Sequence, residues 1–277
     1  MAVGTRTWGR TQVTMEALRA RVARTFLRTR VLDKTGEVSG KKFQQVDLPE
    51  IINLDAKPVA AGGGVDPQTF PATSVSLVID QYNEISMDFE DVLALQEMVN
   101  RKKEFSNKAG KGHGIAVEKY ILALETGIAA GQRTNVAGSL TDSLVLGVMT
   151  SLDISLVPDD DRWFYASPNQ TGELLAEDKF VNLDFIKSGA PVASGMLGTL
   201  YGMTPLKGPL TRRRSFTGVD RTVNFGCHRE WAAVGVQQTI RTKIVQVDLA
   251  ERIMTTMLFG AVLVRGDHIE TLQTTDI

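Results

Sequence analysis

The stretch Ile79–Gln96, "IDQYNEISMDFEDVLALQ", passes from one periodicity to another within a few residues. Apolar and polar residues alternate over 74–79 and, after a change of phase at 82–84, again over 85–89. A period of two is typical of a strand with one buried face, and an extra residue in a strand shifts the phase of the alternation. The pattern therefore predicts one long strand with a bulge in its middle.

A long helix is predicted directly after this strand. Asp88, Glu90 and Asp91 supply the negative charge that a helix N-terminus favours, and no proline follows until well beyond Ala129. One helix of roughly 40 residues would span about 60 Å. Three glycines at 108–114, "KAGKGHG", would each cost about 1 kcal/mol relative to alanine, so a kink or break there is the alternative. We interpret these glycines as a place where a second element packs closely. The spacing and the Ser or Thr of a phosphate-binding P-loop are missing.

The charge is distributed unevenly along the chain. The 277 residues are 43% hydrophobic, enough for one large core or two modest ones. Residues 1–42 contain ten Lys and Arg against three acids, a net +7, so the overall charge of -1 leaves -8 for the remainder. A basic arm on an acidic body indicates an anionic partner or an acidic surface on a neighbouring copy.

Cys227 is the only cysteine, which excludes an intrachain disulfide and a cysteine zinc cluster. The N-terminus lacks the apolar core of a signal peptide. The most apolar stretch, 254–264, is shorter than the roughly 20 residues that a membrane-spanning helix needs. We therefore expect a soluble, intracellular protein with no membrane partner.

The basic region contains a predicted amphipathic helix that begins near Thr14. Further along, 53–73 combines three prolines with a run of three glycines and has no periodicity, as in a long extended loop. Its flanks, 43–48 and 74–80, are strand-like, so the loop is predicted to project as a two-stranded arm. On the helix, one face is apolar and another is basic: Met15, Leu18, Val22 and Phe26 against Arg21, Arg24 and Arg28.

The second half of the chain is predicted to be mixed α/β. An exposed loop is expected at 211–220, and a further helix is marked by Leu249, Ile253 and Met257. Two strands, 260–264 and 268–273, are expected to form a closing pair. The remaining predicted elements are helices at 141–152 and 168–180, and strands at 162–167, 199–206 and within 222–237.

No pattern in the sequence specifies an enzyme. The three histidines lie in different kinds of segment, and no G-x-S-x-G motif occurs. Cys227 and His228 are adjacent on a predicted strand, so they should face opposite ways, as a buried thiol and a surface imidazole. The acidic turn 158–162, "PDDDR", lacks the glycine and the distal glutamate of a calcium loop. We predict no catalytic, cofactor-binding or metal-binding residues.

Three stretches together resemble a known family. They are "LVIDQYNEISMDFEDVLALQ" at 77–96, "GIAVEKYILA" at 114–123 and "LAERIMTTMLFGAVLVRGDHIETL" at 249–272. In order and pattern they are similar to the major capsid proteins of tailed bacteriophages, which have the Hong Kong 97 fold. Relatives often carry Asp where this chain has Lys119, so the match is one of pattern and not of a strict motif.

The resemblance implies an α+β fold with an N-terminal arm, an extended loop, a long spine helix and a mixed α/β domain. Its parts would be an N-terminal arm at 1–40, an extended E-loop at 41–74, a P domain with the spine helix at 75–133, a mixed α/β A domain at 134–257, and return strands of the P domain at 258–277. It also implies a structural protein that is not an enzyme and needs no cofactor. Such proteins self-assemble into hexamers and pentamers of an icosahedral head around double-stranded DNA.

The resemblance further implies partners and a location. The implied partners are portal and scaffolding proteins, with decoration proteins as an optional addition. The implied location is the capsid of the virion, which assembles in the host cytoplasm. An encapsulin-type shell with protein cargo, or a small-oligomer α/β enzyme, are the alternatives. The candidates for contacts between subunits are Met15, Leu18, Val22, Phe26, Lys57 and Phe70. The candidates for charge contacts at the inner surface or between subunits are Arg19, Arg21, Arg24, Arg28, Arg212, Arg213 and Arg214.

Overall fold

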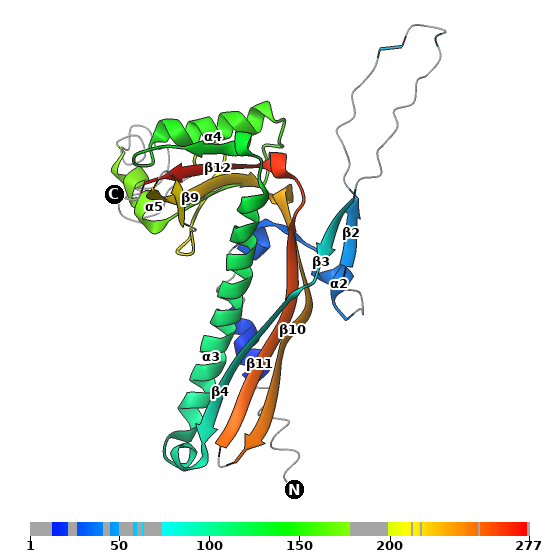
Figure 1. The fold of residues 1–277 in the computed structure, drawn as a ribbon, viewed down its shortest axis with the longest axis vertical. Coiled ribbons are helices and arrows are strands. Elements are labelled where there is room, and N and C mark those ends of the chain that lie inside the picture. The colour runs from blue at the N-terminus through cyan, green and yellow to red at the C-terminus, as the bar shows by residue number, and fades with distance from the viewer. Residues whose placement is uncertain are drawn as a thin grey trace.

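A computed structural model shows an elongated molecule with a compact block at one end (Figure 1). A long helix and a long twisted sheet lie side by side and form the body, and the block of shorter strands and helices lies across the upper end. The structure describes residues 13–21, 27–40, 45–49, 58–59, 63, 74–177, 199–211, 213–216, 218–248 and 250–275, without the side chains of 90–102 and Phe216.

The long helix, α3, runs unbroken from Asp91 to Ala123, and the 3₁₀ turn Leu124–Gly127 follows it. Its 33 residues span about 50 Å. The helix passes through all three glycines, so the alternative of a break is wrong. A β-carbon on Gly110 would lie 2.1 Å from the backbone oxygen of Ala17, which confirms close packing of a second element as the reason for glycine there. None of the described helices is long and apolar enough to cross a membrane.

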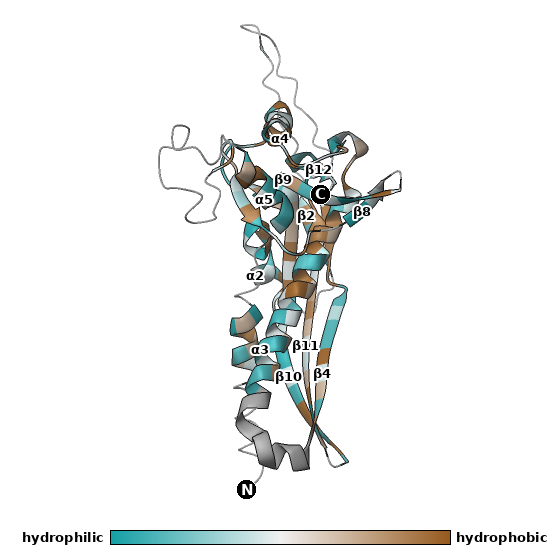
Figure 2. Ribbon diagram, turned by 90° about the vertical axis from the view of Figure 1, so that its left-hand side faces the viewer, coloured by the Kyte–Doolittle hydropathy of each residue, from teal (hydrophilic) through white to brown (hydrophobic). Residues whose placement is uncertain are grey.

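A four-stranded sheet lies beside α3, in the order β1 (Leu32–Asp33), β10 (Ala232–Val247), β11 (Ala250–Leu263) and β4 (Gln81–Glu90). Figure 2 shows hydrophilic and hydrophobic residues mixed along β4, β10 and β11. The predicted helix at 249–257 is wrong, because residues 250–257 belong to β11, which pairs with β10 on one side and β4 on the other. Apolar residues four apart fit a strand as well as a helix, and in β11 the buried positions Ile253, Thr255 and Met257 follow a period of two.

The predicted long strand is two strands that belong to different sheets. β3 (Ser74–Val78) pairs with β2 (Gln45–Pro49), whereas β4 pairs with β11. The chain crosses β11 between them: a β-carbon on Gly260 would lie 2.0 Å from the Val78 oxygen. Because β4 pairs with β11 in continuous register from Gln81 to Glu90, the bulge expected at 82–84 is wrong, and the chain changes partner at 79–80 instead. The strands on both sides of the extended loop do pair as predicted, and most of the loop itself lies outside the described residues.

A six-stranded sheet forms the block. Its main path is β5 (Arg133–Asn135), β12 (Ile269–Thr274), β9 (Val219–His228), β6 (Arg162–Ala166) and β7 (Thr204–Lys207), and β8 (Arg213–Phe216) pairs with β9. Helix α4 (Asp142–Ile154) packs on this sheet, and α5 (Pro168–Ala176) follows β6. The predictions of α4, α5, β6 and β7 are confirmed. The other short elements of the described residues are the helical turn α2 (Thr35–Val38) and four 3₁₀ turns, Leu27–Arg30, Ala130–Gln132, Arg229–Trp231 and Gly266–His268.

Two predictions for the block are wrong. The segment 211–220 is mostly the β8–β9 hairpin and not an exposed loop, since β9 supplies a partner that local sequence does not reveal. The strands near 260–264 and 268–273 exist but do not pair with each other, because β12 leaves β11 and joins β9 and β5. The predicted domain ranges stay a prediction, and their boundary after Met257 falls inside β11.

The largest cluster of buried apolar residues joins the upper part of α3 to both sheets. Ile121 and Leu122 from α3 meet Phe225 from β9 and Phe259 from β11, and Trp231 between β9 and β10 is completely buried. A second cluster fills the block beneath α4. The body and the block therefore share one core, which fixes how they lie relative to each other.

His113 on α3 gives a prediction for the pH dependence of stability. The ring is fully buried, with Nε2 3.1 Å from Thr255 Oγ1, and burial lowers its pKa to about 4, assisted by the charge of Arg21. Between pH 6.5 and 4 the unfolded chain binds a proton that the folded chain does not, so stability falls as pH falls. We expect His113 to contribute a loss on the order of 2 kcal/mol between pH 6.5 and 5.

Urea unfolding at several pH values measures this loss, with His113→Gln as the matched variant. Burial also lowers the pKa of His228 and of His268, so the wild type loses stability through more than one histidine. The slope of the unfolding free energy against pH gives the number of protons that the chain takes up on unfolding. In the variant this number should be smaller by about one. An unchanged slope would contradict the assignment.

Candidate assembly surfaces

The N-terminal helix, residues 13–21, packs on its own chain. Its buried residues include Val13, Ala17 and Ala20, and Ala17 meets α3 at Gly110. Thr14 Oγ1 donates a hydrogen bond of 2.8 Å to Thr242 Oγ1 of β10. The helix is thus held against both α3 and the sheet within one molecule.

The inward face of this helix differs from the face that the sequence predicted. Met15 is 51% exposed, whereas Leu18 is partly buried against the largest core cluster. Because Met15 points outward, it is available to a neighbouring copy, and Leu18 mainly serves its own subunit. Their role between subunits stays a prediction. Val22, Phe26, Lys57 and Phe70 lie outside the described residues.

Arg21 was a candidate for a charge contact, and the structure buries it. Its side chain is 5% exposed, with Nη1 3.5 Å from the sulfur of Met257 on β11. Burial, with the nearby charge of Arg28, lowers its pKa to about 10, so the group remains protonated at neutral pH. The small residues on the inward face leave room for its side chain beside the sheet, a three-dimensional detail that helical periodicity does not reveal.

The other arginine candidates differ in their exposure to solvent. Arg28 contacts Asp33 at 3.3 Å, and Arg214 Nε lies 3.4 Å from the buried carboxylate of Glu125. Arg19 and Arg213 are exposed. Arg24 and Arg212 lie outside the described residues. Of the described candidates, Arg19 and Arg213 are thus the most accessible to an anionic partner.

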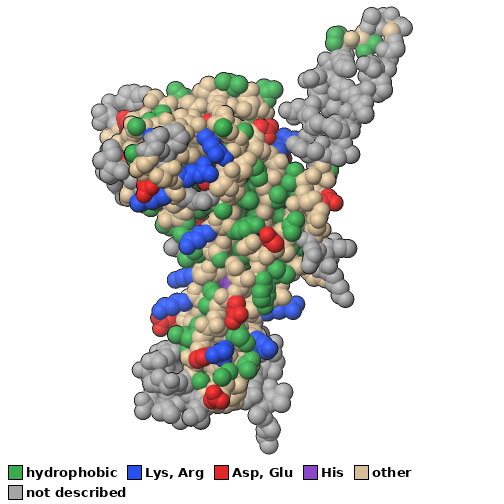
Figure 3. Space-filling view, in the orientation of Figure 1, with side chains coloured by type: hydrophobic (Ala, Val, Ile, Leu, Met, Phe, Trp, Pro, Cys, Tyr) green, Lys and Arg blue, Asp and Glu red, His purple; other side chains and the backbone are tan. Residues whose placement is uncertain are grey.

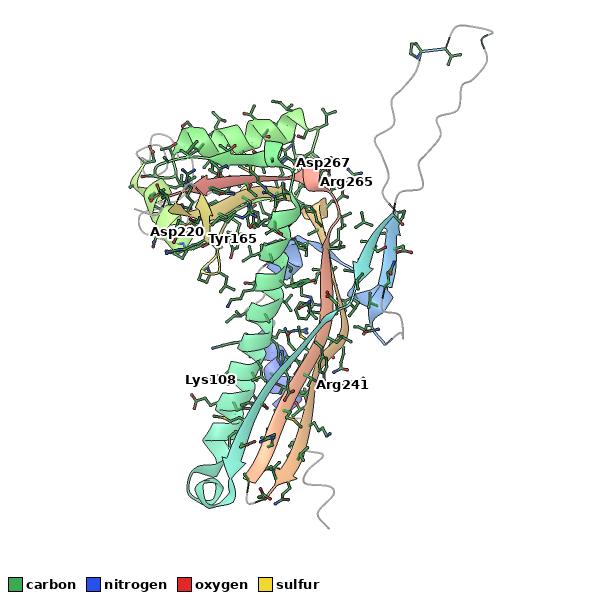
Figure 4. All side chains as sticks on the ribbon, in the orientation of Figure 1. Lys108, Tyr165, Asp220, Arg241, Arg265 and Asp267 are labelled. Atoms are coloured by element: carbon green, nitrogen blue, oxygen red, sulfur yellow. The ribbon has the colours of Figure 1, made fainter. Side chains whose placement is uncertain are left out.

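The spine helix carries a basic surface that the sequence analysis missed. Lys108 points away from the sheet (Figure 4), and Lys and Arg side chains follow the α3 side of the molecule (Figure 3). Lys108 also forms an ion pair of 2.7 Å with Glu104, one helical turn away. The helical phase of the lysines was the signal that could have found this surface. Its exposed lysines are Lys103, Lys108, Lys111 and Lys119.

Two pairs of exposed apolar residues lie at distant places in the fold. Tyr82 and Met87 are 62% and 52% exposed on β4, the last strand of its sheet among the described residues. Ile154 and Leu156 are 78% and 80% exposed where α4 ends. A long edge strand with exposed apolar side chains favours association with another chain, so β4 is a candidate contact surface.

The pair Cys227 and His228 does not form a catalytic site. Cys227 is buried as predicted, and burial raises the pKa of its thiol, so the nucleophilic thiolate is disfavoured. The expected exposure of His228 is wrong, since the end of β9 packs against the turn before β12 and buries the ring beside His268. The acidic turn is engaged by arginines: Arg162 lies 2.9 Å from Asp159, and Arg229 lies 3.8 Å from Asp161.

No known protein-family model and no curated protein matches this chain. Solved structures do resemble it over most of its length. A chain of Mycobacterium phage Che8 is 18% identical with a TM-score of 0.73, covering 90% of both chains. The capsid structure of the cyanophage P-SCSP1u gives 15% identity and a TM-score of 0.70, covering 90% of this chain and 87% of that one.

A protein shell that is not described as a phage capsid is also similar. The holo-SrpI encapsulin complex from Synechococcus elongatus PCC 7942 is 8% identical with a TM-score of 0.61, covering 89% of this chain and 85% of that chain. At these identities the likeness shows a shared fold, with its long helix, long sheet and end block.

Proposed function

We propose that this chain, which has the Hong Kong 97 fold of tailed-phage major capsid proteins, is the coat subunit of an icosahedral phage head. The observation that carries the proposal is the fold itself, matched over about nine-tenths of the chain by phage capsid structures. The role is structural and not enzymatic. Hexamers and pentamers of the chain would tile the shell in the virion, and assembly would take place in the host cytoplasm.

The exposed apolar residues support this assembly. Strand β4, which carries Met87, and helix α4, which Leu156 follows, lie far apart in Figure 1, so different neighbours would cover the two residues. A subunit in a closed shell has several neighbours at once, and many weak contacts together hold it firmly. Heterologous contacts that close on themselves form rings and shells. The paired strands β2 and β3 would carry the E-loop toward an adjacent subunit.

Packaged double-stranded DNA is the anionic partner that we propose. Lys108 and Lys111 on α3, with Arg19 on the N-terminal helix, supply accessible positive charge. Such contacts bind phosphate without reading the base sequence and weaken as salt increases. Portal and scaffolding proteins would be the further partners, with decoration proteins as an optional addition. No membrane contact is part of the proposal.

The particle mass of the purified protein tests the proposed function. Light scattering combined with negative-stain microscopy, with and without co-expressed phage proteins, should find closed shells or the hexamers and pentamers that form them. Met87→Asp places a charge on the exposed edge strand, and we expect it to reduce assembly while leaving the circular dichroism spectrum unchanged. A uniform monomer or dimer under every condition would reject the shell and favour the small-oligomer enzyme.

The contents of the particles distinguish the two kinds of shell. A phage head should retain nucleic acid when the packaging proteins are present. Particles that exclude nucleic acid but enclose one foreign protein would instead favour the encapsulin-type alternative.

A further inference from the structure

We propose that His228, Glu230 and His268 bind a divalent transition-metal ion of the zinc class at the junction between the two sheets. One ligand atom from each of these residues can be chosen so that all three atoms lie within 4.8 Å of one another. The two imidazoles are buried, with ring centroids 5.3 Å apart, and the Glu230 side chain is about half exposed. The site therefore has two buried imidazoles in fixed positions and one adjustable carboxylate.

The three residues lie where the chain passes between the six-stranded and the four-stranded sheet. The chain leaves the six-stranded sheet through the 3₁₀ turn Arg229–Trp231 and returns to it through the turn Gly266–His268. The N–H groups of Val264 and Arg265 donate to the Trp231 oxygen at 2.9 and 3.1 Å, so the turns are already tied. A metal bound by residues from both turns would fasten both crossings between body and block.

His268 offers an unused ligand atom. Its Nδ1 is buried and has no hydrogen-bond partner among the described residues, and Glu230 Oε2 lies 4.0 Å from it. An unpartnered polar atom in a buried place is costly, and a metal that takes the place of the proton on Nδ1 would give this nitrogen a partner. Imidazole nitrogen and carboxylate oxygen suit zinc and its neighbours, whereas magnesium and calcium prefer oxygen alone.

Metal binding requires a small rearrangement. Zinc ligands at 2.0–2.1 Å from the ion lie roughly 3.3 Å from one another, so the Glu230 side chain must move inward. As a metal ligand, His228 Nδ1 would give up the long 3.3 Å hydrogen bond that it accepts from the Glu230 N–H, whereas binding through Nε2 would keep it. The exposed side chain of Glu230 is free to make the larger part of this movement.

Two charged residues beside His268 should change the affinity for the metal in opposite directions. Arg265 Nη1 lies 3.1 Å from His268 Nε2, and because a guanidinium only donates, Nε2 accepts and the ring proton lies on Nδ1. A metal on Nδ1 moves that proton to Nε2, where Asp267 Oδ2 at 3.8 Å can accept it after Arg265 turns aside. Figure 4 shows both residues where β11 leads into β12. Arg265 thus weakens metal binding, and Asp267 strengthens it.

Calorimetric titration of the purified full-length protein with zinc chloride, in a buffer that does not chelate, tests the site. We expect one zinc per chain, no comparable binding of magnesium, and loss of this binding in His268→Gln. Glu230→Gln, whose side chain is exposed enough for the fold to tolerate the change, should bind at least tenfold more weakly. Arg265→Gln should bind several-fold more tightly than the wild type.

Two control variants separate the site from its neighbours. Cys227→Ser should bind zinc as the wild type does, because the thiol lies on the other side of the strand. Asp160→Asn, in the acidic turn near His228, should also leave binding unchanged. Absence of stoichiometric zinc, equal binding by Glu230→Gln, or dependence on Cys227 or Asp160 would each overturn the proposal.

Discussion

Gly110→Ala is expected to destabilise the folded chain by about 2–3 kcal/mol, although alanine is the better helix former. Gly110 lies inside α3, where alanine would gain about 1 kcal/mol in an exposed helix. The new β-carbon would lie 2.1 Å from the backbone oxygen of Ala17 and 2.8 Å from its Cα. Because backbone atoms cannot rotate away, the whole N-terminal helix must shift, and Val13, Ala17 and Arg21 lose part of their burial.

Urea unfolding and limited trypsin digestion measure the effect. Cleavage at the exposed Arg19 should become faster as the N-terminal helix loosens. Gly112→Ala is the matched control on the same helix, since its β-carbon would meet the side-chain end Ile85 Cδ1 at 2.8 Å. That side chain can move, so we expect a change within about 1 kcal/mol of zero. Equal stability of the two variants would show that α3 and the N-terminal helix do not pack as closely as described.

Trp231→Ala is expected to lower the free energy of unfolding by about 3–5 kcal/mol, the range for truncating a large buried aromatic residue. Trp231 is fully buried in the core that joins body and block, with its ring centroid 5.8 Å from that of Phe225. Truncation leaves a cavity where α3 and the two sheets meet. The loss should therefore weaken the attachment of the block as well as the global stability.

Trp231→Phe serves as the matched variant. The Trp231 Nε1 group has no hydrogen-bond partner among the described residues, so phenylalanine removes volume without breaking a bond. We expect Trp231→Phe to lower the free energy of unfolding by about 1–2 kcal/mol, because the phenyl ring is smaller than the indole. Chemical denaturation followed by circular dichroism gives both values, and hydrogen exchange shows whether the block opens first. A loss below about 1 kcal/mol for the alanine variant would contradict the shared core.

Local sequence patterns predicted several elements correctly because each of these patterns fits only one type of secondary structure. Helix α3 combines acidic residues at its start with a long stretch free of proline, and α4 and β6 have clear apolar patterns. The strands β2 and β3 flank a segment rich in proline and glycine, and they pair as expected. The glycines in α3 were correctly interpreted as a packing site.

The errors have a common physical cause. Apolar residues spaced by four suit both a helix and a strand, and in β11 the choice is made by hydrogen bonds to β10 and β4, which are distant in sequence. The break between β3 and β4 exists because the chain must cross β11 at Gly260. A pattern within one segment carries no information about such partners.

The candidate surfaces divide in the same way. Sequence alone indicated a basic N-terminal region and, through the resemblance, a shell-forming fold. It could not tell which side of the N-terminal helix faces inward, so Arg21 was assigned to a surface and is buried. Nor could it bring His228 and His268 together, since 40 positions separate them and only the return of β12 beside β9 makes them neighbours.

The sequence by itself determined the long helix, because helical hydrogen bonds join residues close in the chain, and the charge of the N-terminal region, which is a matter of composition. It also indicated the strands β2 and β3, because both flank one segment rich in proline and glycine. Tertiary structure alone decided the strand identity of 250–263, the inward face of the N-terminal helix and the histidine pair at the junction. These features depend on backbone hydrogen bonds and close packing between segments far apart in sequence, and those contacts exist only once the chain has folded.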